Sequence, residues 1–199
     1  MYPEIQKQLA RAKETNFLDI ADCAINNFEG FPAALPELQE LHLENNYFHT
    51  LEGMPEMPKL VKLFAANNEL ADFSGCAREY PILMEFNVAH NQISTFAQFP
   101  KCPWLKYLDL SHNKFKTLAG FPPTLHLHLV DLHLEGNPIE TFAGMEAPGL
   151  FTVILRISKE TLATLNLGDK ERRLVEETID YPIGQALKAL ETYLGIKNG

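Results

Sequence analysis

The sequence predicts an α/β solenoid: a curved parallel sheet with an irregular or 3₁₀ convex side, closed by a helical cap at each end. Three observations predict it. Apolar residues recur with a period of 22 to 24 residues from Leu38 onward, which is longer than the period of a helix or a strand and indicates stacked repeats. An asparagine returns at one phase of that period, and prolines gather where each unit closes.

Each repeat unit is expected to form one layer of the solenoid. "LKYLDLSHNKFKTLAGF", from Leu105, is a clear copy, and the clear copies together begin at Leu38, Leu60, Leu83, Leu105 and Leu129. A degenerate copy begins at Thr15 and a truncated copy, "LFTVIL", at Leu150. We therefore expect about seven units over residues 15–155.

Within L-x-x-L-x-L, the fourth and sixth positions differ by two, so their side chains share one side of a short strand and face the core. The third and fifth positions then face away from the core, on the concave side. Because a single layer leaves both its faces open to water, stability is expected to come from stacking, with each buried Leu or Phe contributing roughly 1.5 to 3 kcal/mol.

The asparagines recur at the same position of successive repeat units, which predicts a structural ladder. Where the strand ends, the chain turns inward and buries backbone N–H and C=O groups that no sheet partner reaches. An amide side chain can satisfy both kinds of group, whereas the cysteine of the first unit can do so only weakly. The predicted ladder consists of Cys23, Asn46, Asn68, Asn91, Asn113 and Asn137.

The pattern L-x-x-L-x-L-x-x-N-x-L-x-x-L, carried by the five clear copies, resembles the leucine-rich repeat. Its period is most similar to the short repeat class found in the regulatory subunit of protein phosphatase type 1 and in axonemal dynein light chains. The resemblance covers residues 15–155. It implies a curved solenoid that binds proteins and has no catalytic activity, and it names no partner.

The segments on either side of the repeats are predicted to be helical caps. Residues 1–14 place Pro3 at a first helical position and Ile5, Leu9 and Ala12 at helical spacing. Residues 156–199 contain two stretches with helical periodicity, which we interpret as a larger cap. An alternative is that this C-terminal segment docks a partner or a second copy of the chain.

Composition restricts the class of partner. The formal net charge is −9 and the sequence pI is about 5.2, so the molecule should repel nucleic acid and anionic lipid and favour a protein partner with a basic surface. The sequence shows neither a secretory signal at its start nor a run of 18 apolar residues. Three cysteines without a C-x-x-C pair suggest free thiols, and we expect a cytoplasmic location.

The outward-facing strand positions predict the binding surface. Carboxylates outnumber the cations Lys62, Lys106 and Arg156 there, so the face is expected to be acidic and partly aromatic. Phe64 and Tyr107 are the expected anchors, because large aromatic side chains dominate binding energy once buried. The predicted protein-binding residues are Glu40, His42, Lys62, Phe64, Glu85, Asn87, Tyr107, Asp109, Asp131 and His133.

Catalysis, a cofactor and a metal site are not expected. Asp109, Asp131 and His133 could approach a shared ion, but an open sheet face spreads its side chains, and zinc requires three or four converging ligands. No nucleophile elbow, phosphate-binding loop or dinucleotide fingerprint occurs. The favoured interpretation is a monomeric or weakly dimeric protein-binding adaptor. Its alternatives are a structural protein that self-associates through the C-terminal helices and, less favoured, a metal-dependent hydrolase.

Overall fold

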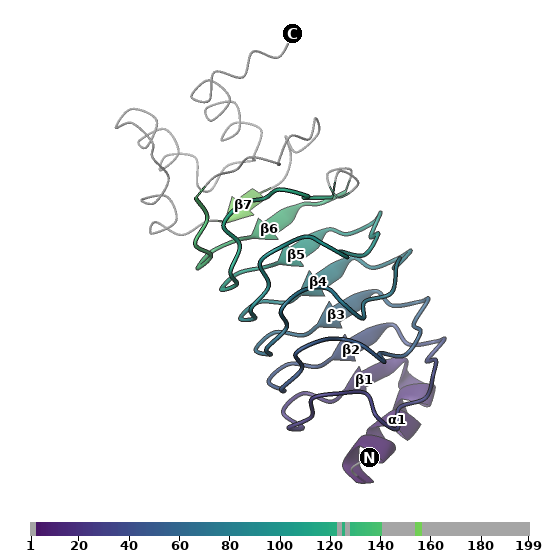
Figure 1. Ribbon diagram of the computed structural model, residues 1–199. Helices are drawn as coiled ribbons and strands as arrows, with labels where there is room; N and C mark the ends of the chain where they lie inside the picture. The colour runs from purple at the N-terminus through teal and green to yellow at the C-terminus, as the bar shows by residue number, and fades with distance from the viewer. Residues whose placement is uncertain (1–2, 123–124, 126–127, 141–153, 157–199) are drawn as a thin grey trace.

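The computed structural model describes residues 3–122, 125, 128–140 and 154–156. Among these residues, Figure 1 shows an N-terminal helix followed by a stack of solenoid turns. The helix α1 spans Pro3–Thr15. Seven short strands follow, which are β1 (Phe17–Asp19), β2 (Glu40–His42), β3 (Lys62–Phe64), β4 (Glu85–Asn87), β5 (Tyr107–Asp109), β6 (Asp131–His133) and β7 (Ile154–Arg156). The predicted α/β solenoid is confirmed.

The strands form one parallel sheet in the order of the sequence, from β1 to β7. Equivalent residues of the repeat are paired, so that Leu41 lies beside Leu63 and Phe86 beside Leu108. In β1 to β6 the central residue of each strand is buried, while the two flanking residues are exposed or half-buried. The three-residue strand therefore presents one side chain to the core and two to the concave side.

The predicted phase of the last unit is wrong. A start at Leu150 puts Ile154 at the fifth position, but β6 pairs with β7 through Leu132 and Leu155, and His133 lies beside Arg156. The backbone therefore places Ile154 at the third position and Arg156 at the fifth. The cause is the run "LFTVIL", where apolar residues occur at both parities and several phases fit the pattern equally well.

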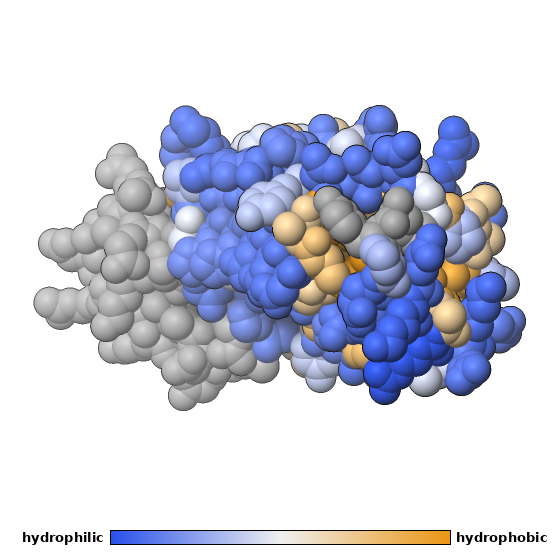
Figure 2. All heavy atoms as spheres, turned by 90° about the horizontal axis from the view of Figure 1, so that it is seen from below, coloured by the Kyte–Doolittle hydropathy of each residue, from blue (hydrophilic) through white to orange (hydrophobic). Residues whose placement is uncertain are grey.

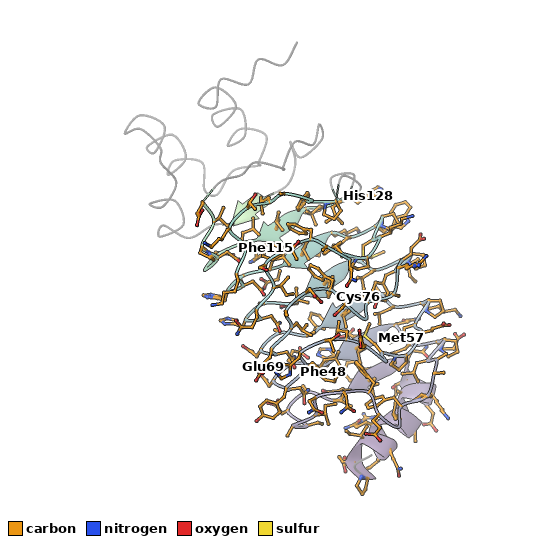
Figure 3. The ribbon with its side chains drawn as sticks, in the orientation of Figure 1. Phe48, Met57, Glu69, Cys76, Phe115 and His128 are labelled. Atoms are coloured by element: carbon orange, nitrogen blue, oxygen red, sulfur yellow. The ribbon has the colours of Figure 1, made fainter. Side chains whose placement is uncertain are left out.

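The core is a column of leucine and phenylalanine side chains stacked from unit to unit. Phe48 and Phe115 are completely buried, and both lie inside the solenoid in Figure 3. Phe28 packs on Phe48, and Phe96 on Phe115, each pair with ring centroids 4.8 Å apart. Because these partners belong to successive units, burial joins each layer to the next.

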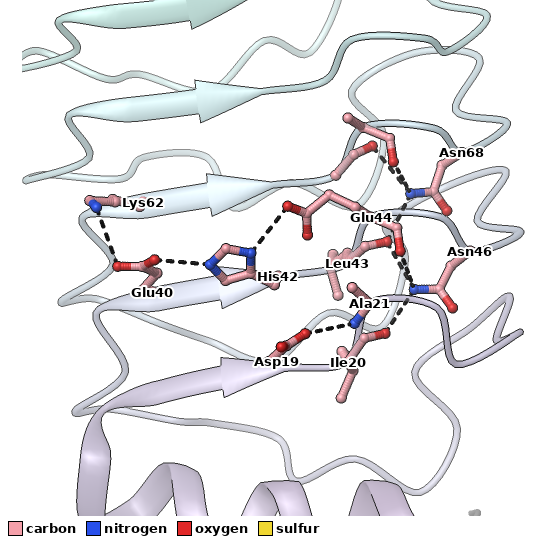
Figure 4. Close-up of polar contacts among 12 residues, drawn as sticks. Asp19, Ile20, Ala21, Glu40, His42, Leu43, Glu44, Asn46, Lys62 and Asn68 are labelled. Carbon is pink, nitrogen blue, oxygen red and sulfur yellow. Dashed lines mark hydrogen bonds and ion pairs between the residues drawn. The ribbon is translucent and has the colours of Figure 1, made fainter.

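Asparagine side chains hold together the turns that follow the strands. Asn46, Asn68, Asn91, Asn113 and Asn137 are all buried. In the fifth unit, Asn113 Oδ1 accepts a hydrogen bond from Ile93 N–H of the fourth unit at 2.9 Å. Its Nδ2 donates to Val88 O at 2.9 Å and to Leu110 O at 3.1 Å. Asn46 and Asn68 accept from Ile25 N–H and Phe48 N–H in the same way, and Figure 4 shows the bonds that their Nδ2 atoms donate to carbonyl groups. Each amide thus satisfies backbone groups of two successive units.

A helix covers the outer side of the first unit, because no solenoid turn precedes this unit. Helix α1 covers it with Ile5, Leu9 and Ala12, which are buried as the sequence pattern predicts. Asn16 ends the helix in a left-handed conformation, with φ of 58° and its N–H bonded to Ala12 O. Cys23, at the asparagine phase, is half-buried and packs against the core.

The convex side is irregular, as predicted, and isolated bridges join Ala34 to Glu56 and Glu79 to Lys101 across successive units. In the described part of the chain, no helix is both long enough and apolar enough to cross a membrane. The predicted C-terminal cap over residues 156–199 lies outside the described residues, apart from the backbone of Arg156. The domain boundaries at residues 14 and 155 stay predictions.

Candidate protein-binding face

The concave face consists of the outward-facing first and third residues of β1 to β6. It includes all ten predicted binding residues, which lie in two columns that cross the sheet. Strand pairing places Tyr107 between Glu85 and Asp131 in one column, and Asp109 between Asn87 and His133 in the other. Phe17 and Asp19 extend the two columns onto β1.

At the N-terminal end of the concave face, His42 is held between two carboxylates (Figure 4). Its Nε2 lies 2.9 Å from Glu40 Oε1, and its Nδ1 lies 3.1 Å from Glu44 Oε1. Lys62 Nζ approaches the other oxygen of Glu40 at 3.4 Å. The ring also stacks on Phe64, with centroids 4.6 Å apart. His42 and Lys62 are therefore engaged within the face.

A second copy of this arrangement occurs four strands along. His133 Nε2 lies 3.3 Å from Asp131 Oδ1, and its Nδ1 lies 3.7 Å from Glu135 Oε1. The sequences "ELHLE" at 40–44 and "DLHLE" at 131–135 produce the two sites, because alternate residues of a strand point to the same side. Glu44 and Glu135 each also have a buried Oε2 without a hydrogen-bond partner in the structure.

The carboxylates shift the protonation equilibrium of His42. Burial alone would lower its pKa, but the hydrogen bonds and negative charges of Glu40 and Glu44 outweigh burial and raise the pKa above its ordinary value of 6.5. Burial likewise opposes the ionised form of Glu40, yet His42 and Lys62 lower the pKa of this carboxyl below 4.5. The folded state therefore favours a protonated His42 beside an ionised Glu40.

This pair predicts a pH-dependent contribution to stability. Because the pKa of His42 is raised, its contribution to stability is complete below about pH 6.5 and is lost as pH rises through the folded-state pKa. Because the pKa of Glu40 is lowered, its contribution to stability is lost as pH falls below about 4.5. We expect His42→Gln to reduce the free energy of unfolding more between these values than at about pH 9. Urea denaturation at both pH values measures the difference.

His49→Gln is the control, because the His49–Glu69 pair is largely exposed and exposed pairs contribute little. Equal destabilisation of the His42→Gln variant at both pH values would show that its loss comes from packing on Phe64 and has no electrostatic origin.

At other fifth positions, the side chain caps the end of its own strand. Asp19, Asn87 and Asp109 each use Oδ1 to accept the backbone N–H of the residue two positions later, at 3.1, 2.9 and 2.9 Å. These side chains are fixed by local bonds, as in Asx turns. A bound partner would meet them as preorganised polar groups.

The two predicted aromatic anchors differ in the structure. Phe64 is half-buried and stacked on His42, so its ring is already partly covered. Tyr107 is 49% exposed and lies between carboxylate-bearing residues of the neighbouring strands. Tyr107 has more surface to lose on binding and is the better candidate anchor.

Metal and thiol chemistry find little support within the described residues. No group of three or more His, Cys, Asp or Glu side chains there is arranged to hold a metal ion; at His42 the carboxylates occupy the ring nitrogens that a metal would use. Burial, followed by the influence of Cys102, raises the pKa of Cys76 to about 12. Burial also raises the pKa of Cys102 to about 12, so both thiols are poor nucleophiles.

The prediction from the sequence missed a group of exposed apolar side chains beside the concave face. We call Ile82, Met84, Trp104 and Val130 the apolar edge, and each of them is exposed. They occupy the positions immediately before and after the first Leu of units four to six. Reading those two columns down the repeat would have found them, because an apolar residue at an unburied phase is the signal.

Comparison with known proteins identifies the repeat. Residues 104–127 match the family model described as Leucine Rich Repeat. No curated protein matches the chain. The similarity to the short repeat class of the phosphatase and dynein proteins stays a prediction.

Proposed function

Because this chain is a leucine-rich repeat protein, with the parallel solenoid that such repeats form, we propose that it is a non-catalytic adaptor that binds a protein partner through its concave face. Leucine-rich repeat proteins are generally interaction modules without enzymatic activity. Solenoids of this kind offer extended concave surfaces for recognition.

The observation that carries the proposal is the row of carboxylates around an exposed aromatic ring. Glu85 and Asp131 flank Tyr107 on the paired strands, and Asp109 follows two residues later on the same strand. With a net charge of −9, this surface favours a partner that presents lysine or arginine. Such complementarity raises the association rate and orients the encounter.

The proposal includes the absence of a cofactor and a cytoplasmic location. The three cysteines are free, which fits a reducing compartment. Carboxylates engage His42 and His133, and the high pKa values of Cys76 and Cys102 make these two thiols unreactive. We propose a monomer or weak dimer, since like net charges oppose tight self-association.

Charge reversal on the concave face is expected to slow association. A variant with Glu85, Asp109 and Asp131 replaced by lysine should bind a basic partner with an association rate lower by on the order of tenfold or more, and with a weaker salt dependence. The partner would come from a pull-down with the wild-type chain. Surface-binding kinetics at two ionic strengths would measure the rates, with circular dichroism verifying the fold.

A matched control changes net charge equally but elsewhere. Glu14, Glu29 and Glu52 are exposed and lie outside the concave face, so their replacement by lysine should affect association only slightly. If both triple variants slow association to the same extent, net charge alone acts and the concave face is not the binding site.

A further inference from the structure

The apolar edge lies where the strands of units four to six begin. Met84, Lys106 and Val130 are adjacent across these units, because Lys106 N–H donates to Met84 O and Val130 N–H donates to Lys106 O, at 2.9 and 2.8 Å. Met84 O also accepts Tyr107 N–H at 3.0 Å, which places this row directly beside the concave face.

Trp104 is the largest side chain of this edge. It is the only tryptophan of the chain, and it is 50% exposed. Its indole stacks on His128 of the next unit, with ring centroids 4.4 Å apart, so the ring is held in place while one side faces solvent. Figure 3 labels His128 on the side where the strands begin and Glu69 on the side where they end. A fixed, half-exposed indole is the kind of group that dominates binding energy in interfaces.

Exposed large apolar side chains are few in the described residues, and they gather near this edge. The face seen in Figure 2 is mostly hydrophilic, with hydrophobic residues in limited areas. Of the seven large apolar side chains that are exposed in the described residues, five lie between the end of unit three and the start of unit six, namely Ile82, Met84, Trp104, Tyr107 and Val130. An exposed apolar patch with polar surroundings marks an interaction site.

We propose that the apolar edge and the carboxylates next to it together bind one segment of a basic protein partner, in which an aliphatic or aromatic residue is flanked by lysine or arginine. This inference rests on the proposed function and defines the partner's chemistry. The apolar residue packs against Trp104, Met84 and Val130. The basic residues lie over Glu85, Asp109 and Asp131.

The charges set the direction of the segment. The ammonium group of Lys106, between Met84 and Val130, repels a cation at the edge itself, while its alkyl stem adds apolar surface. The segment's apolar residue therefore lies at the edge itself. Its basic residues lie further along the sheet, over Glu85 and Asp131 at the first strand positions and Asp109 at the third. A second copy of this chain, or an anionic membrane, would bring negative charge against a chain with a net charge of −9, and both are disfavoured.

Trp104 provides a direct test, since all tryptophan fluorescence comes from this site. In the free full-length protein we expect emission at long wavelength and ready quenching by acrylamide. A short peptide of alternating lysine and leucine should shift the emission to shorter wavelength and protect the indole. A peptide with serine in place of leucine should bind on the order of tenfold more weakly, and one with glutamate in place of lysine should not bind.

Variants locate the contact. Met84→Ser combined with Val130→Ser keeps the fluorescent residue and should weaken the lysine–leucine peptide on the order of tenfold. The control is Tyr47→Ser, because Tyr47 is 55% exposed but does not belong to the edge. The affinity of this variant for the lysine–leucine peptide should equal that of the wild type. Retained affinity of the Met84/Val130 variant, together with loss in the Glu85/Asp109/Asp131 variant, would overturn this inference while leaving the proposed function intact.

Other outcomes also decide the matter. If neither variant loses affinity, both the inference and the concave-face proposal are wrong. If Trp104 in the free protein already emits at short wavelength and resists quenching, the edge is covered by the chain itself. If sedimentation shows a dimer that the Met84/Val130 variant abolishes, the edge binds a second copy. Either of these last two results would overturn the proposal that the edge binds a basic partner.

Discussion

Replacing Phe86 by alanine is expected to lower the free energy of unfolding by about 3 to 5 kcal/mol. Phe86 is the central residue of β4, is completely inaccessible to solvent, and lies between units on both sides. From the sheet side, its ring faces those of Phe73 and Phe99, with centroids 6.1 and 6.0 Å away. The substitution removes a large apolar side chain and leaves a cavity that these rings cannot fill without moving.

The position in the middle of the sheet increases the effect. Each layer is stabilised by its two neighbours, so loosening β4 weakens its contacts with both β3 and β5. Urea denaturation followed by circular dichroism measures the change. Met84→Ala, two residues earlier but exposed, should cost much less. A Phe86→Ala variant as stable as Met84→Ala would contradict the assignment of Phe86 to the core.

Replacing Asn113 by alanine is expected to cost on the order of 1 to 3 kcal/mol for each backbone group left unpaired. The side chain is 1% exposed and serves the N–H of Ile93 and the carbonyl groups of Val88 and Leu110. Water cannot replace these bonds without entering the turn. Chemical denaturation of the Asn113→Ala variant should show a clearly lowered midpoint.

Asn26→Ala is the surface control, because Asn26 is exposed and only accepts a bond from the neighbouring Asn27. Equal midpoints for the two alanine variants would refute the structural role of the buried amide. Asn113→Asp separates hydrogen bonding from volume. It keeps the shape but loses the donor, and at neutral pH its carboxylate would face carbonyl oxygens, so it should also be destabilising. Wild-type stability in this variant would show that the donor is dispensable.

Much of the fold could be predicted because one layer of the solenoid is encoded within one repeat unit. The inward positions must be apolar, as at Leu105, Leu108 and Leu110, which are all fully buried. The turn after the strand needs a side chain with both donor and acceptor, as at Asn113. Since the same requirements return in every unit, the period and the phase of the central units can be read from the sequence.

The same local reasoning failed where the pattern was ambiguous. In "LFTVIL" no asparagine follows to set the phase, and apolar residues stand at both parities. Strand pairing with β6 selected Leu155 as the partner of Leu132. A hydrogen-bonded register depends on the neighbouring strand as well as on the strand's own composition.

The ten predicted binding residues show which features follow from the sequence and which require the tertiary structure. Their outward direction follows from strand alternation, and the sequence by itself determined that they share a face. Their availability does not follow: Asn87 and Asp109 cap their own strands, and Phe64 lies on His42. Tyr107 alone combines a large ring with high exposure among these ten.

The sequence by itself therefore determined the repeat, the buried leucines and amides, and the acidic character of one face, because these depend on residues within a single unit. Only the tertiary structure brought Trp104 against His128, and Met84 beside Lys106 and Val130. These residues lie in separate units about one repeat period apart in the chain. Stacking of the units makes them neighbours, and no pattern within one unit contains that adjacency.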